Sequence, residues 1–347
     1  MGGKYRVGVI VGDGVGPEII DAALGLLDLV DAEFELTQIE AGLSRYRREG
    51  VPITEEDIDL MRSLDATLKG PLMTLPGRQG YRSVNVLIRK ELGLYANVRP
   101  FRSYPRVSLL SLDIVIIREN TEGLYSGIEW RAPDSAYSVR MITEVGSRRV
   151  IRFALDYALS RRRRRVTVVH KANILKESDG LFREIFLEEI ARYEGIEHDE
   201  VFVDAAAYLM VKNPSRFDVI VTPNLYGDIL SDLAAGLAGS IGLFGSAQIG
   251  DHTAVFEPVH GTAPDIAGRG IANPSSAMKA LSLMLEYLGV RKGDEGLIYA
   301  SKAIDEALHR VISEGRVLTP DLGGSASTAE FARAVKCVAS ELLGSVT

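Results

Sequence analysis

The sequence predicts an α/β protein, in which a sheet carries helices on its faces. Short strand-like runs of apolar residues alternate along the chain with longer stretches of helical periodicity. Of the 347 residues, 46% are hydrophobic and 25% are charged, which is typical of a globular protein. This length is large for a single hydrophobic core, so we expect two domains, or one domain with a large insertion.

The first element is predicted to be a buried strand over residues 5–11, because the run YRVGVIV is mostly apolar. The glycine-rich segment GDGVG at residues 12–16 then turns the chain into a helix that begins near Pro17. Leu24, Leu27 and Val30 continue this helix at helical spacing. Further strands are predicted at residues 66–69, 113–118, 166–170, 201–204 and 218–222, and helices at residues 147–160, 179–193 and 225–238.

Charge and apolar patterning argue against several classes of protein. The chain has 40 Lys and Arg residues and 47 Asp and Glu residues, and the net charge of −7 does not fit a basic nucleic-acid-binding protein. No apolar run approaches the roughly 18–20 residues of a membrane span, and we expect no signal peptide. Cys337 is the one cysteine and cannot form an internal disulfide. We therefore expect a cytoplasmic protein without membrane or nucleic-acid partners.

The glycine-rich turn suggests a dinucleotide-binding motif, but its spacing does not fit. Gly12, Gly14 and Gly16 give G-x-G-x-G, whereas the Rossmann fingerprint is G-x-G-x-x-G. Pro17 lacks an N–H donor at the helix start, and Glu18 places negative charge where a phosphate would bind. A tight strand-to-helix turn is therefore favoured over a phosphate site.

Two carboxylates of the segment NLYGDILSD indicate a metal site. Asp228 and Asp232 are four residues apart on a predicted helix, so both project from one face. Like charges in this arrangement repel unless a cation lies between them, and oxygen ligands without His or Cys favour Mg²⁺ or Mn²⁺. Asp204, at the end of the predicted strand VFVD, is a candidate third ligand. The alternative for the pair is a solvated helix face, but a strand end directly before this helix is where α/β proteins build sites.

Several cationic residues and a tyrosine are candidates for substrate binding and proton transfer. Arg89, Arg99 and Arg118 lie in successive short elements beside apolar residues, and converging guanidinium groups would suit a small polycarboxylate. Salt bridges to nearby glutamates are the alternative for each arginine. Lys171 ends the strand VTVVHK, where neighbouring cations would lower its pKa toward neutrality. Tyr125 could serve as the complementary acid.

Five segments together carry a family resemblance. In chain order they are KGPLMTLPGRQGYRSVNVLIRKELGLYANVRP, IVIIRENTEGLYSGIEW, VTVVHKANI, PNLYGDILSD and FEPVHGTAPDIAGRGIANP. They resemble the β-decarboxylating dehydrogenases, the family of isocitrate, 3-isopropylmalate and homoisocitrate dehydrogenases, over nearly the whole chain. The resemblance implies the isopropylmalate dehydrogenase-like two-domain fold, which is not an ordinary Rossmann fold. Residues 1–94 and 239–347 would form a large domain, residues 95–238 a smaller inserted one, with the active site in the cleft between them.

The resemblance also implies a homodimer and a metal-dependent mechanism. The small domains would pack together through the segment after Trp130, and Lys171 and Asp204 would enter the neighbouring subunit's site. The metal would chelate the substrate's α-carboxylate and 2-hydroxyl, NAD(P)⁺ would take a hydride from C2, and loss of CO₂ would leave an enolate that is reprotonated. By motif position, the residues with assigned roles are Arg89, Arg99 and Arg118 for the substrate carboxylates, Lys171 for the hydroxyl proton, Tyr125 for the enolate, and Asp204, Asp228 and Asp232 for the metal, one of them from the partner chain.

Cofactor choice follows from the same resemblance. The cofactor site is assigned to Thr74, His260, Gly261, Asp265, Ile266 and Asn273. Asp265 would accept hydrogen bonds from the adenosine ribose hydroxyls and would repel a 2′-phosphate. NADP-dependent relatives carry Lys-Tyr in place of Asp265-Ile266, so we expect NAD.

Substrate choice depends on the residues just before Arg89. Ser83 and Asn85 match the S-x-N of isocitrate dehydrogenases and would donate to the γ-carboxylate of isocitrate, where isopropylmalate needs an apolar wall. The expected substrate is therefore isocitrate, and homoisocitrate, mixed specificity and 3-isopropylmalate remain alternatives. A regulatory subunit without activity is a more distant alternative, because such subunits lose clamp or metal residues that this chain keeps.

Overall fold

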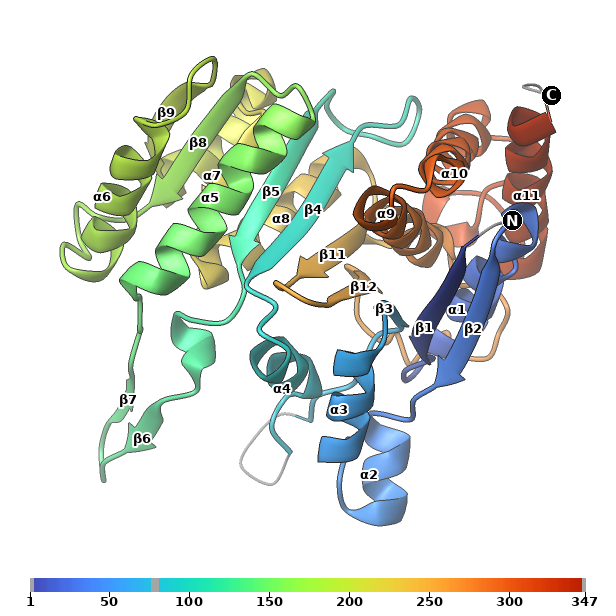
Figure 1. Ribbon diagram of the computed structural model, residues 1–347, viewed down its shortest axis with the longest axis horizontal. Helices are drawn as coiled ribbons and strands as arrows, with labels where there is room; N and C mark the ends of the chain where they lie inside the picture. Colours follow the sequence, from blue (N-terminus) through green and yellow to red (C-terminus); the bar gives the residue numbers. More distant parts are fainter. Residues whose placement is uncertain (1–2, 76–80, 345–347) are drawn as a thin grey trace.

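One sheet of ten strands runs through the computed structural model, which describes residues 3–75 and 81–344 (Figure 1). The strand order is β2-β1-β3-β12-β11-β4-β5-β10-β8-β9. Pairing is parallel except around β11 and β4, where β11 is antiparallel to β12 and β4, and β4 is antiparallel to β5. The strands are β1 Lys4–Ile10, β2 Glu33–Gln38, β3 Ala66–Lys69, β4 Ala96–Arg102, β5 Asp113–Glu119, β8 Arg165–His170, β9 Glu197–Phe202, β10 Val219–Thr222, β11 Gly245–Ile249 and β12 Ala254–Pro258.

Helices cover both faces of this sheet, so strands inside it are buried on both faces. In Figure 1, α5 lies in front of β5 and β8, whereas α7 and α8 lie behind them. All four residues of β3 and of β10 are buried. The helices are α1 Gly16–Leu24, α2 Leu43–Glu49, α3 Glu55–Ser63, α4 Val84–Glu91, α5 Glu144–Ser160, α6 Ser178–Ile190, α7 Val203–Lys212, α8 Asn224–Ala238, α9 Ser275–Lys292, α10 Glu295–Glu314 and α11 Thr328–Gly344. Of the helices described, none is long and apolar enough to cross a membrane.

The sheet is ordered by chain segment. The strands of residues 95–238 form one side of it, β4-β5-β10-β8-β9, and the remaining strands form the other side. The change occurs between β11 and β4, so the segment expected to be an inserted domain joins the sheet there. The expected domain boundaries remain a prediction.

A second, two-stranded sheet projects away from the main body (Figure 1). It consists of β6 (Glu129–Arg131) and β7 (Ala136–Ser138), which pair antiparallel. The rings of Trp130 and Tyr137 stack at 5.3 Å between centroids on this hairpin, and both side chains are exposed.

Most predicted elements are confirmed, but the first helix is shorter than predicted and one strand is wrong in its second half. The helix predicted to continue through Leu24, Leu27 and Val30 ends at Leu24, where Gly25, a poor helix former, follows. A separate 3₁₀ turn forms at Leu27–Leu29, and Val30 is extended. Strands form at residues 66–69, 113–118, 166–170 and 219–222, and the three predicted helices form within or around α5, α6 and α8. The strand predicted at residues 201–204 instead ends at Phe202, and Val203 begins α7. Asp204 therefore lies in the first turn of a helix. The run DAAAYLM has high helix propensity, and a carboxylate is stabilised at a helix N-terminus.

Candidate active site

Three arginines from the consecutive elements α4, β4 and β5 lie close together. Arg89 lies in the last turn of α4, Arg99 in β4 and Arg118 near the end of β5. Their exposed fractions are 7%, 5% and 1%. The antiparallel register places Asn97 opposite Arg118, so Arg99, two residues further along β4, shares its face. The structure thus brings together the three predicted clamp residues.

Asp228 of α8 faces this group. Its Oδ1 accepts hydrogen bonds from Arg118 and, at 3.5 Å, from Arg99 Nη1, and its Oδ2 accepts one from the Tyr125 hydroxyl at 2.6 Å. Burial raises the pKa of Asp228, but the charges of Arg118 and Arg99 outweigh this effect and hold it below its usual value. Asp228 therefore stays ionised and partly neutralises the arginines.

The Arg118 guanidinium is held on one side and unpaired on the other. Nε donates to Asn224 Oδ1 at 2.9 Å, whereas Nη2 is buried and has no hydrogen-bond partner among the described residues. Burial, followed by the charges of Arg89 and Arg99, lowers the pKa of Arg118 to about 9. Arg118 reaches this position because α8 passes close by at Gly227, where a Cβ would lie 2.6 Å from Arg118 Cβ. A buried, unpaired N–H among three cations is a place for an anion.

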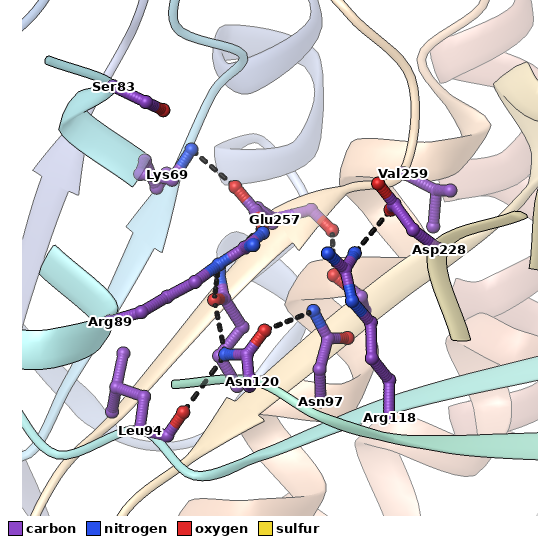
Figure 2. A network of polar contacts seen from close by, with 12 residues as sticks. Lys69, Ser83, Arg89, Leu94, Asn97, Arg118, Asn120, Asp228, Glu257 and Val259 are labelled. Atoms are coloured by element: carbon purple, nitrogen blue, oxygen red, sulfur yellow. Dashed lines mark hydrogen bonds and ion pairs between the residues drawn. The ribbon is translucent and has the colours of Figure 1, made fainter. Parts of the chain in front are cut away.

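A second network fixes Arg89 (Figure 2). Arg89 Nε donates to Gln248 Oε1 at 2.7 Å, and Gln248 Nε2 donates to Glu257 Oε1 at 2.6 Å. Glu257 also pairs with Lys69 of β3, whose side chain is 1% exposed. Burial raises the pKa of Glu257, but the charges of Lys69 and Arg89 outweigh it and lower this pKa below its usual value. Asn120 extends the network by donating to Gln248 Oε1 at 3.0 Å.

Sequence reasoning did not assign roles to Glu257, Gln248, Asn97, Asn120 and Asn224. A signal for two of them exists in the strand pattern. Gln248 and Glu257 are long polar side chains in the buried strands GSAQI and AVFEP. A buried charge requires a partner, so Glu257 in a buried strand predicts a cation nearby.

The two candidate proton-transfer residues lie in different places. Tyr125 lies in the short 3₁₀ turn Leu124–Ser126, with the Arg118 guanidinium 5.0 Å from its ring centroid. Burial, and the hydrogen bond to Asp228, raise the pKa of Tyr125 although Arg118 opposes them. Lys171 follows β8 and forms an ion pair with Asp204. In the described ranges, no hydrogen bond or ion pair joins Lys171 or Asp204 to the Arg118–Asp228 group.

The residues expected to select the substrate lie at the start of α4. Ser83 directly precedes the helix and accepts a hydrogen bond from Thr74 Oγ1 at 3.3 Å. Asn85 lies one turn before Arg89, and its Oδ1 is buried without a partner in residues 3–75 and 81–344. The unpaired atom is an acceptor, whereas Nδ2 of the same amide, one turn from Arg89, is the donor suited to a ligand carboxylate.

Four of the six predicted cofactor residues line one cavity of about 550 Å³, namely His260, Gly261, Ile266 and Asn273. His260 Nδ1 is 2.8 Å from the Gly261 carbonyl, and burial lowers the pKa of His260, so the ring is neutral at pH 7. Asn273 Nδ2 donates to Asp321 Oδ2 at 3.0 Å, and Asp321 also lines the cavity. Asp265 is exposed beside Ile266. Thr74 is exposed in the loop after β3 and does not line this cavity.

Comparison with known proteins identifies the family. The family model described as isocitrate/isopropylmalate dehydrogenase matches residues 6–335. The chain belongs to this family. It is therefore an enzyme, an oxidoreductase of the β-decarboxylating dehydrogenases, and the expected fold class is confirmed.

Relatives of this dehydrogenase carry three substrate names. It is 42% identical to the 3-isopropylmalate dehydrogenase of Archaeoglobus fulgidus over 95% of this chain and 98% of that protein. It is 44% identical to the isocitrate/homoisocitrate dehydrogenase of Thermus thermophilus, over 95% and 97% of the two chains. The crystal structure of isocitrate dehydrogenase from Methylococcus capsulatus superposes with a TM-score of 0.90 at 44% identity, covering 96% of this chain and 99% of that one. Because the sequence identities to relatives with different substrates are nearly equal, they show the family but do not distinguish the substrate.

Dehydrogenases of this family use a divalent metal and NAD(P), and the donor set on α8 fits a hard cation. Asp228 and Asp232 provide carboxylate oxygens one helical turn apart. Burial raises the pKa of Asp232, with Arg99 opposing this and the nearby Asp228 charge adding to it, so a cation would stabilise its ionised form. No group of three His, Cys, Asp or Glu side chains suited to a metal occurs in the part of the chain described. One chain therefore supplies two of the three predicted carboxylate ligands at this place.

Proposed function

We propose that this dehydrogenase oxidises and decarboxylates isocitrate to 2-oxoglutarate, with NAD as the electron acceptor and Mg²⁺ or Mn²⁺ as the metal. The observation that carries the proposal is the group of three buried arginines around an unpaired guanidinium nitrogen, Arg118 Nη2. Positive charge concentrated in this way suits a small molecule with several carboxylates, because each guanidinium can bind a carboxylate through two parallel hydrogen bonds.

In the free enzyme, protein carboxylates neutralise the cations that would bind the substrate. Asp228 pairs with Arg118 and Arg99, and a bound acid would compete with it for both guanidinium groups. Glu257 pairs with Lys69 and lies 3.4 Å from Arg89 Nη2, so it keeps Arg89 in place while a substrate exchanges with Asp228.

Tyr125 is the proposed proton donor to the enolate. Its raised pKa keeps the hydroxyl protonated at neutral pH, and its hydrogen bond to Asp228 orients it toward the arginines. Lys171 is the proposed acceptor of the substrate's hydroxyl proton. Lys171 pairs with Asp204 and, within residues 3–75 and 81–344, forms no hydrogen bond or ion pair with the Arg118–Asp228 group, so we assign Lys171 and Asp204 to the site of a second subunit.

Asp228 and Asp232 would hold the cation together with Asp204 of the second copy. When bound, the cation stabilises negative charge on the substrate oxygen, and NAD accepts the hydride. The exposed carboxylate of Asp265, beside the cavity lined by His260, favours the ribose hydroxyls of NAD over a 2′-phosphate.

A homodimer follows from this assignment, since each site needs residues of two chains. The projecting hairpin supports it, because Trp130 is 55% exposed and Tyr137 is 48% exposed on an arm that lies away from the sheet. Exposed aromatic side chains gathered in this way are typical of protein interfaces. One cysteine in the whole chain supports a cytoplasmic location.

Residues at the start of α4 favour isocitrate over 3-isopropylmalate. Asn85 presents an amide, whose donor is Nδ2, and Ser83 presents a hydroxyl, one to two turns before Arg89. Both can donate to a γ-carboxylate, whereas the isopropyl group of isopropylmalate would leave them unpaired. Homoisocitrate, which also ends in a carboxylate, is the alternative substrate that these donors can accept.

Initial rates with the three acids and both cofactors, for the wild type and for Asn85→Leu, test the proposal. We expect the wild type to use isocitrate with NAD most efficiently. A lost hydrogen bond to a charged group should cost Asn85→Leu about 10- to 100-fold in kcat/KM for isocitrate, and activity toward isopropylmalate should be spared. Leu87→Ala, at a 37%-exposed position of the same helix, is the control and should change little. A wild type that is faster with isopropylmalate, or equal losses on both acids, would overturn the isocitrate assignment.

A further inference from the structure

The glycine-rich turn at residues 12–16, for which the sequence indicates no phosphate site, lies between two loops of the active site. On one side is the loop after β3, residues 70–75, which carries Thr74 and follows Lys69. On the other side is the loop after β12, residues 259–266, which carries His260 and Gly261. Val15 of the turn also lines the cavity assigned to the cofactor.

The turn is bonded to both loops. Asp13 N donates to the Pro71 carbonyl at 2.7 Å, and Asp13 Oδ2 accepts from Met73 N at 2.9 Å. Val15 N donates to the Thr262 carbonyl at 3.0 Å. The turn therefore binds the loop of residues 70–75 through Asp13 and the loop of residues 259–266 through Val15.

Close packing explains why this turn needs glycine. A Cβ on Gly12 would lie 2.4 Å from the Pro71 carbonyl oxygen, and a Cβ on Gly14 would lie 1.9 Å from the Thr262 carbonyl oxygen. Both residues have positive φ. The glycines thus admit two protein carbonyls at positions where a dinucleotide fingerprint would admit a pyrophosphate.

Asp13 is the side chain that anchors this arrangement. It is 7% exposed, and besides Met73 N it accepts from Leu43 N at 3.1 Å with both carboxylate oxygens. A Cβ on the neighbouring Gly42 would lie 2.4 Å from Asp13 Oδ2, so the carboxylate fills its space. An amide in its place would set a donor against one of the two backbone N–H groups.

We propose that the turn at residues 12–16 is a bracket that sets the spacing of the loop of residues 70–75, which follows Lys69 and carries Thr74, and the loop of residues 259–266, which carries His260, with Asp13 as its positioning residue. The assignment of both loops to the active site rests on the proposed function. The bracket itself rests on contacts within the free protein. A change at either end of the turn should therefore disturb both loops.

Two substitutions with matched controls test the bracket. Asp13→Asn is paired with Asp65→Asn, because Asp65 also accepts a backbone N–H, that of Arg6 at 2.8 Å, at the start of β3 and away from the site. Gly14→Ala is paired with Gly50→Ala, because Gly50 also has positive φ but has nothing within 4 Å of an added Cβ. Asp65→Asn reproduces the loss of a carboxylate that accepts a backbone N–H, and Gly50→Ala reproduces the strain of a side chain at positive φ, and neither touches an active-site loop.

Hydrogen exchange of the free protein and binding of NAD without any acid give the decisive readouts. Asp13→Asn should speed exchange at Met73 and also in residues 259–266, and Gly14→Ala should speed exchange in residues 70–75, each by about 3- to 10-fold. Both variants should weaken NAD binding and raise KM for the acid, whereas neither control should.

Exchange confined to the loop nearest each substitution, or kinetic changes no larger than those of the stability-matched controls, would overturn the bracket. Because exchange needs no substrate, a wrong substrate assignment would leave that readout intact. The failure of the bracket and the failure of the proposed function are therefore distinguishable.

Discussion

Asp228 pairs with Arg118, and the two side chains differ in burial: that of Arg118 is 1% exposed and that of Asp228 is 36% exposed. The same carboxylate is a candidate metal ligand. An acid that binds Arg118 would therefore release Asp228 to a cation, which links the binding of acid and metal.

We expect divalent-metal affinity to increase when isocitrate is present, and isocitrate affinity to increase by the same factor when metal is present, as linkage requires. Titration calorimetry in both orders measures this.

Chelation should abolish turnover, and Asp228→Asn should lose metal-dependent activity while remaining folded. An Asp228→Asn enzyme with the wild-type rate at trace metal would remove Asp228 from the metal site.

Lys171→Met should lower kcat by about 10²- to 10⁴-fold with a modest change in KM, as for loss of a general acid–base group. If Lys171 acts in the neighbouring site, mixing inactive Lys171→Met with inactive Asp228→Asn chains creates one intact site in each mixed dimer. Random exchange should then restore about a quarter of the wild-type rate, since half of the dimers are mixed and each has one of two sites. No recovery after verified exchange would place each site within one chain.

Replacing Asp265-Ile266 with Lys-Tyr should shift the kcat/KM ratio from NAD toward NADP, because a repulsive charge is exchanged for an attractive one beside the 2′-phosphate. Asp31→Lys makes a charge reversal at an exposed position outside the cofactor cavity and serves as the control. The proposal for this loop fails if the ratio stays at its wild-type value or if the control shifts it equally.

Glu257→Gln should destabilise the fold by roughly 3–5 kcal/mol, because it leaves the buried Lys69 ammonium without its partner. Denaturant unfolding measures this. Glu306→Gln breaks an exposed pair with Arg310 and should cost about 0–1 kcal/mol.

The difference in free energy of unfolding between wild type and Glu257→Gln should depend on pH, because the pKa of Glu257 is lowered in the folded state. A depressed folded-state pKa contributes stability that is complete above the unfolded value of 4.5 and is lost as the pH falls through the folded value. The gap between wild type and Glu257→Gln should thus be constant above pH 4.5 and narrow below it. A gap that widens in acid would show that Glu257 is not held as the carboxylate.

Much of the fold could be predicted from the sequence, because its signals are local. The short runs at residues 66–69 and 219–222 form buried strands, and Pro17 lies in the first turn of a helix because its φ is fixed at a helical value. The error at Asp204 is also local in origin, since the apolar residues before it fit either a strand or the first turn of a helix, and the helix-forming run that follows begins α7 at Val203.

The site divides in the same way. The sequence by itself determined the family, the candidate residues and their chemistry, because motif residues keep their types and order along the chain. It gave no contact between Arg118 and Asp228, or between Lys69 and Glu257, which are 110 and 188 residues apart in the numbering. Only the tertiary structure decided these pairs, and with them the role of Asp13. Ion pairs and close backbone contacts depend on distances in space, which the topology of the sheet sets and the spacing of residues along the chain does not.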